Sequence, residues 1–67
     1  MRHWALIERA YGEYEISVHK SKKAAIDFIG CSYTSTKVRA GAYEISTEGT
    51  DNIVCTKPNA IKMGYVI

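Results

Sequence analysis

The segment Trp4-Ala5-Leu6-Ile7 is apolar at every position, which constrains the fold more than any other stretch of the sequence. In an extended strand, successive side chains point to opposite faces of the sheet. Trp4 and Leu6 therefore share one face, and Ala5 and Ile7 share the other. Continuous apolarity of this kind is typical of a strand that is covered on both sides. We expect such a strand over residues 2–9.

Alternation and capping signals predict the next two elements. Glu13 to His19 alternates apolar and polar residues, which predicts a half-buried strand joined to the first strand by a turn at residues 10–12. Ser21 to Gly30 is predicted to be a helix, because serine suits an N-cap and glycine suits the left-handed residue at the C-terminus. The apolar stripe of this helix comprises Ala24, Ala25, Phe28 and Ile29.

The second half of the chain predicts mainly strands and turns. Strands are expected over residues 32–39, 43–47, 53–56 and 61–67, with a turn at 40–42 and a loop at 48–52. The segment Lys57-Pro58-Asn59 is expected to interrupt the chain before the last strand. A short helical turn over residues 59–63 is the alternative to that strand.

The same four residues occur twice, as Tyr14-Glu15-Ile16-Ser17 and as Tyr43-Glu44-Ile45-Ser46, each with a glycine two positions upstream. The helix follows only the first copy, so we interpret the repeat as convergence on a good strand sequence or as a partial pseudo-repeat. Tyrosine and isoleucine are strong strand formers, and both copies are predicted to place them on the sheet face under the helix. Glu15 and Glu44 are predicted to be solvated.

These elements predict a single α+β domain over residues 1–67, with the order ββαββ(ββ). An antiparallel sheet of four to six strands carries one helix, Ser21 to Gly30, on one face. A helix of this length leaves the other face of the first strand without cover. An exposed apolar sheet face usually marks an interaction site, so we expect self-association or a partner protein to cover it.

The sequence gives little support for catalysis or for metal binding. The candidate metal ligands His3, His19, Cys31 and Cys55 lack the close pair spacing of structural zinc sites. The two cysteines are expected to be reduced, and neither lies in a sequence context that would activate a thiolate. No glycine-rich phosphate loop is present. We therefore expect no metal, no cofactor and no enzymatic activity.

Two groups of residues are candidates for binding. The aromatic residues Trp4, Tyr11, Tyr33 and Tyr65 are candidate contacts with a partner protein, because aromatic side chains dominate interfaces. A basic cluster is a candidate anion site beside the start of the helix, and it comprises Lys20, Lys22, Lys23, Lys37 and Arg39. The alternative is that these lysines only keep the surface soluble.

The first half of the chain also has a family likeness. It reads Trp-Ala-Leu-Ile-Glu, a turn, Tyr-Glu-Ile-Ser-Val, and then Ser-Lys-Lys-Ala-Ala-Ile-Asp-Phe-Ile. This order resembles small uncharacterised accessory proteins of bacteriophages and mobile elements. The likeness covers less than half of the chain and contains no catalytic residue. The resemblance implies a small accessory protein that acts on a host protein.

The sequence thus predicts a non-enzymatic binding protein, in its most concrete form a phage-type inhibitor or modulator that occupies a surface of a host protein. The alternative is a binder of nucleic acid or of a small anionic ligand through Lys20 to Lys23. A net charge of +2 is too weak to favour nucleic acid by itself. No signal peptide and no apolar run long enough to span a bilayer is evident, so we expect a cytoplasmic location and no membrane partner.

Overall fold

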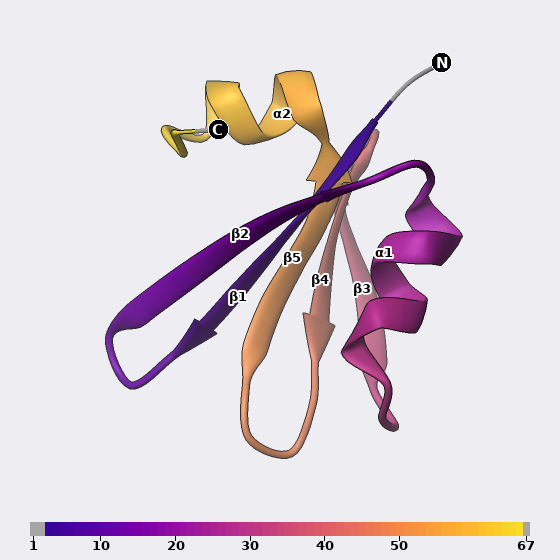
Figure 1. Cartoon of the computed structure of the whole chain (residues 1–67), viewed down its shortest axis with the longest axis vertical. Coiled ribbons are helices and arrows are strands. Elements are labelled where there is room, and N and C mark those ends of the chain that lie inside the picture. Colours follow the sequence, from indigo (N-terminus) through magenta and orange to yellow (C-terminus); the bar gives the residue numbers. More distant parts are fainter. Residues whose placement is uncertain (1–2, 67) are drawn as a thin grey trace.

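A five-stranded antiparallel sheet runs through the centre of the computed structural model, which describes residues 3–66 (Figure 1). The elements are β1 (Trp4–Ala10), β2 (Glu13–His19), α1 (Lys22–Ile29), β3 (Thr34–Arg39), β4 (Ala42–Ser46), β5 (Asp51–Thr56) and α2 (Lys57–Lys62). The strand order β2-β1-β5-β4-β3 leaves β2 and β3 at the two edges. The predicted α+β class is confirmed. The predicted start of the first strand at Arg2 and the predicted end of the last strand at Ile67 lie outside the described residues.

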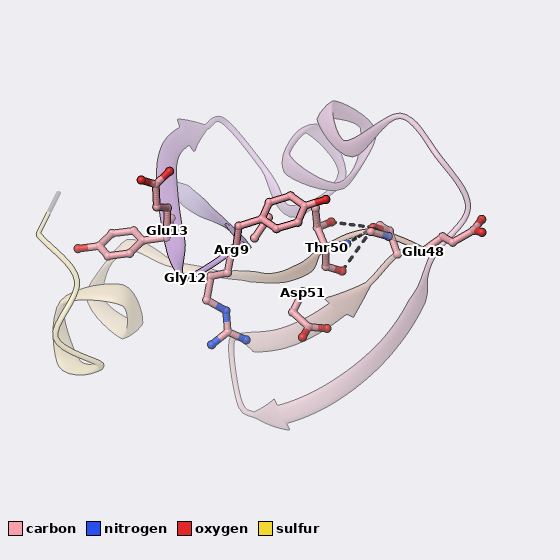
Figure 2. Close-up of a pocket in the computed structure, with 11 residues that line it drawn as sticks. Arg9, Gly12, Glu13, Glu48, Thr50 and Asp51 are labelled. Carbon is pink, nitrogen blue, oxygen red and sulfur yellow. Dashed lines mark hydrogen bonds between the residues drawn. The ribbon is translucent and has the colours of Figure 1, made fainter.

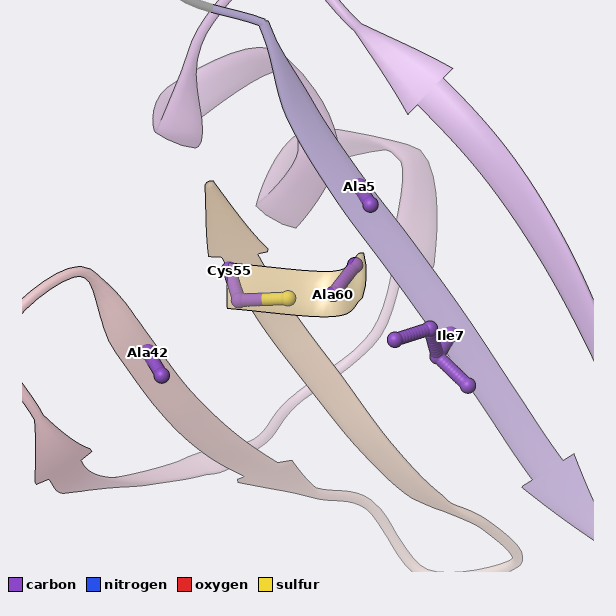
Figure 3. Close-up of a cluster of buried hydrophobic side chains, with 5 residues drawn as sticks. All are labelled: Ala5, Ile7, Ala42, Cys55 and Ala60. Carbon is purple, nitrogen blue, oxygen red and sulfur yellow. The ribbon is translucent and has the colours of Figure 1, made fainter. Parts of the chain in front are cut away.

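Strand β1 is covered on both sides, as its sequence predicts. Leu6 is fully buried with Ala25 of α1 on one side, which we call the α1 face. Ala5 and Ile7 are fully buried with Ala60 of α2 on the other side, the α2 face (Figure 3). The expectation that another molecule covers the second face of β1 was therefore wrong, because the chain itself supplies a second helix.

Helix α1 has the predicted caps and part of the predicted stripe, since Ala25 and Ile29 both belong to the cluster on the α1 face. The Oγ of Ser21 accepts a hydrogen bond from the Ala24 amide at 3.1 Å, and Gly30 ends the helix with a φ of 72°. Ala25 is buried, with Ile26 packed against the same cluster. Phe28, which was predicted to pack inward, is 60% exposed and lies beside the His19 ring of β2, 5.0 Å between centroids. It projects toward the β2 edge rather than into the core.

Helix α2 replaces the predicted last strand. Pro58 was expected to interrupt the chain, yet it lies in the first turn of α2, where its missing N–H would have no helical partner in any case. The alternative of a helical turn over residues 59–63 is thus confirmed, with a start two residues earlier. Met63 and Tyr65 follow α2 and pack on the α2 face.

The two copies of the repeat face opposite sides of the sheet. Ile16 lies opposite Ile7 in β1, so the first copy places its tyrosine and isoleucine on the α2 face. Tyr43 and Ile45 of the second copy pack on the α1 face. The prediction that both copies lie under the first helix was therefore wrong for the first copy. A strand sequence fixes which residues share a face, but the neighbouring strands decide which face that is.

Candidate functional site

The four aromatic candidates do not meet on one surface. Trp4 lies half-buried on the α1 face, stacked on Tyr43 with 6.3 Å between ring centroids. Tyr11 is fully exposed in the β1–β2 turn. Tyr33 precedes β3 and is 46% exposed, whereas Tyr65 packs edge-on at 5.4 Å against Tyr14 on the α2 face. The structure thus distributes these rings over several parts of the molecule.

Two of the basic candidates, Lys22 and Lys37, lie next to Tyr43 on the α1 face. The Nζ of Lys22, in the first turn of α1, lies 3.7 Å from the centroid of this ring. Lys37 in β3 lies directly opposite Tyr43 in the strand register, so both side chains are on the α1 face. A cation over an aromatic face is held by the ring quadrupole. This arrangement also explains how α1 tolerates a lysine at its N-terminal end.

The remaining basic candidates lie around this pair. Lys23 forms an exposed ion pair with Asp27 at 2.7 Å, and the hydrogen bond to Asp27 raises the pKa of Lys23. Lys20 is exposed in the bend between β2 and α1. Arg39 lies opposite Ala42, which places it on the α2 face, away from Lys37. The predicted cluster is thus divided between the two faces of the sheet.

A shallow hollow of about 350 Å³ lies between α1 and Tyr33. Lys22, Lys23, Ile26 and Asp27 line it on the α1 side, where Asp27 is paired with Lys23. Together with the pair around Tyr43, it forms a basic and aromatic surface that leads from α1 to β3. We call Lys22, Tyr33, Lys37 and Tyr43 the basic site. Tyr43 lies on the sheet face under the first helix, as its sequence predicts, but its contact with Lys22 was not predicted.

Strand β3, which borders the basic site, is exposed at all six positions. It is the last strand of the sheet, and no other strand within residues 3–66 pairs with its outer edge. The amide of Thr56 donates to the Gly41 carbonyl at 2.9 Å, which shows that Gly41, Tyr43 and Ile45 direct their backbone groups toward β5. The alternate residues of β4 must then bond to β3.

Alternate residues of an antiparallel strand bond to the neighbouring strand, and the residues between them point the other way. Ser35 and Lys37 therefore direct their backbone N–H and C=O groups away from the sheet. A register shift after Lys37 ends the regular part of the edge. Polar residues on both alternating faces of Thr34-Ser35-Thr36-Lys37 are a sequence signal for an uncovered edge strand.

A larger hollow, about 630 Å³, lies elsewhere, between the β1–β2 turn and the β4–β5 loop (Figure 2). The carboxylates of Glu13, Glu48 and Asp51 line it together with Arg9. The loop is fixed by Thr47, whose Oγ accepts from the Thr50 amide at 3.1 Å. This end of the molecule is therefore acidic, in contrast to the basic site.

Other chemistry is sparse in the described part of the chain. Within residues 3–66, no three His, Cys, Asp or Glu side chains gather as they would around a metal ion. Cys31 and Cys55 are not bonded to each other, and burial raises the pKa of the Cys55 thiol, which disfavours the reactive thiolate. Neither of the two helices in this range has the length and apolarity needed to cross a membrane.

Comparisons with models of protein families, with curated proteins and with solved structures find no match to this chain.

Proposed function

We propose that this protein is a non-enzymatic binding protein that takes up an extended, acidic segment of another protein along the outer edge of β3. The observation that supports this most strongly is the exposure of β3 on both faces and along its edge. A free strand edge offers a row of backbone donors and acceptors that an extended segment can satisfy by adding a strand.

The charge beside this edge supports an acidic partner. Lys37 lies in the regular part of the edge, and Lys22 lies on the same face. Two copies of β3 paired about Lys37 would place this lysine opposite itself, and like charges across a strand pair are destabilising. An acidic segment would instead find a lysine near its carboxylates. Carboxylate–lysine pairs would therefore favour a foreign strand over a second β3.

Such a binding mode suits an inhibitor or modulator of a host protein. A small protein that holds an extended segment prevents that segment from folding or binding elsewhere, and it needs no catalytic group to do so. The side chains around the edge would set specificity, with Tyr33 and Tyr43 as aromatic contacts on the α1 face.

Binding of a single-stranded nucleic acid is the second candidate. It is favoured by the arrangement of Lys22 over Tyr43 and of Tyr43 against Trp4, since aromatic rings next to cations are a common platform for bases and phosphates. Binding of this kind would weaken steeply with salt, because phosphate contacts release counterions.

The two candidates can be separated by substitutions in β3. The probes are a peptide that alternates glutamate and valine, and an oligodeoxythymidylate, each titrated by fluorescence anisotropy. Ser35→Pro removes an outward N–H without removing a β3–β4 hydrogen bond, and Lys37→Glu reverses the nearest charge. Ser32→Pro, in the exposed loop before β3, is the matched control. Each β3 variant should bind the peptide roughly three- to tenfold more weakly than wild type, and Ser32→Pro should bind normally.

Strand addition is overturned if Ser35→Pro binds the peptide as tightly as wild type. The nucleic-acid alternative gains support if Lys37→Glu and Lys22→Glu weaken binding of the oligonucleotide while Ser35→Pro has no effect. Failure of wild type to bind either probe at low salt would remove both candidates. Circular dichroism of each variant establishes that the fold is retained.

A further inference from the structure

The opposite edge of the sheet, β2, has a different character from β3. Three large apolar or aromatic side chains are exposed along it: Tyr14 (52%), Val18 (43%) and Phe28 (60%). Tyr14 and Val18 lie on the α2 face of β2, and Phe28 reaches the α1 face of the same strand beside His19. The β2 edge is thus flanked by apolar groups on both faces, which favours a protein interface.

The backbone of β2 offers a regular row of free groups. The His3 carbonyl accepts a hydrogen bond from the Lys57 amide at 3.1 Å, so the odd-numbered residues of β1 bond toward β5. The even-numbered residues of β1 then bond to Glu13, Glu15, Ser17 and His19. This alternation leaves the N–H and C=O groups of Tyr14, Ile16 and Val18 directed outward. The pairing of β2 with β1 continues without a register shift over all seven residues.

We propose that the β2 edge binds a second copy of this chain, with the two β2 strands antiparallel about a two-fold axis at Ile16. Each copy places Tyr14 opposite the partner's Val18 and Ile16 opposite the partner's Ile16. On the other face, Glu13 lies opposite the partner's His19 and Glu15 opposite the partner's Ser17. The outward-directed groups of Tyr14, Ile16 and Val18 then meet their counterparts, and the sheet continues through both copies.

Charge and the length of the pairing together select this register among the symmetric ones. Pairing about Tyr14 would place Glu13 opposite the partner's Glu15, and pairing about Glu15 would place that carboxylate opposite itself. Pairing about Ser17 would leave Glu13 without an opposite strand residue. The register about Ile16 pairs all seven residues of β2 and opposes no like charges. The strand is therefore complementary to itself along its whole length.

The same register accounts for Tyr11, whose side chain is fully exposed. It places Tyr11 level with the partner's Ser21, at the start of the partner's α1. The two β3 edges would lie at the far ends of the continuous sheet and stay free. This inference does not depend on the proposed function of β3. A dimer would present two free β3 edges.

Sedimentation velocity over a wide range of protein concentration tests the proposal. We expect wild type to form a dimer. Glu13→Lys places a lysine opposite the partner's His19 and near the partner's Lys20, and His19→Glu places a carboxylate opposite the partner's Glu13. Each substitution acts twice in a symmetric dimer and should raise the dissociation constant roughly two- to thirty-fold. The double variant Glu13→Lys/His19→Glu exchanges the charges and should restore dimer formation.

A monomer at every concentration would overturn the proposal, and so would a dimer that both single variants leave unchanged. A double variant no stronger than either single variant would overturn the register. Val18→Pro removes an outward N–H at an exposed position and should also weaken the dimer, whereas Ser35→Pro in β3 should not. A dimer lost only in Ser35→Pro would assign self-association to β3 and contradict this inference. Circular dichroism of each variant checks that the fold is intact.

Discussion

At the scale of single residues, Asn59 connects α2 to the rest of the molecule. Its Nδ2 lies 2.8 Å from the Thr56 Oγ and 3.1 Å from the Ala40 carbonyl, so it ties the helix to the β3–β4 turn. Gly41 in that turn has a φ of 77°, and a Cβ there would lie 2.8 Å from the Asn59 Nδ2. The glycine is therefore required both by the backbone conformation and by the close approach of Asn59.

Gly41→Ala should consequently destabilise the fold more than Gly12→Ala. Gly12 has the same φ of 77°, but a Cβ added there would meet no atom within 4 Å. Gly12→Ala should cost about 1 kcal/mol from the left-handed conformation alone. Gly41→Ala should cost roughly 1–2 kcal/mol more, because Asn59 must move away from its acceptors. Urea denaturation of both variants measures the difference, and equal losses of stability would contradict this role of Asn59.

At the scale of elements, local signals predicted those parts that depend on local chemistry. The cap residues of α1, Ser21 and Gly30, were identified from their side-chain and backbone preferences alone. The face assignment of the repeated segment was wrong because it depends on strand order, which has no local signal. The main prediction for this segment was a strand and not helix α2, because Pro58 can both interrupt a strand and start a helix.

The six-residue helix α2 should depend on packing, since a helix this short is not stable on its own. Ala60 is fully buried in the cluster with Ala5 and Cys55, whereas Ile61 beside it is 59% exposed. Ala60→Glu should lower the free energy of unfolding by roughly 2–4 kcal/mol. Ile61→Glu should change it by less than about 0.5 kcal/mol. Thermal and urea unfolding compare the two, and a tolerated Ala60→Glu would show that α2 does not cover the core.

At the scale of the whole molecule, charge is separated along the strands. The β1–β2 and β4–β5 turns lie at the same end of the sheet (Figure 1). Carboxylates gather toward this end, namely Glu8, Glu13, Glu15, Glu48 and Asp51. Basic residues gather toward the opposite end, namely Lys20, Lys22, Lys23, Lys37, Arg39 and Lys57. A net charge of +2 conceals this separation. An antiparallel pairing of two copies along β2 would bring the acidic end of each beside the basic end of the other.

The candidate site could be predicted from the sequence only in part. Lys22 and Lys37 were identified as basic candidates, but their meeting around Tyr43 depends on the register between β3 and β4. The four aromatic candidates do not lie together in the structure. They were grouped by residue type alone, although their positions are far apart in the chain. The polar composition of β3 carried the one signal that pointed to the free edge.

Amide hydrogen exchange at Ser35 and Lys37 tests the central claim most directly, because strand addition must protect the N–H groups that point outward. In the free protein these two amides should exchange quickly, while that of Thr36, which bonds to β4, should exchange slowly. With the acidic peptide at saturation, we predict that Ser35 and Lys37 become protected and Thr36 changes little. Unchanged exchange at Ser35 and Lys37 in the bound state would contradict the proposed mode of binding.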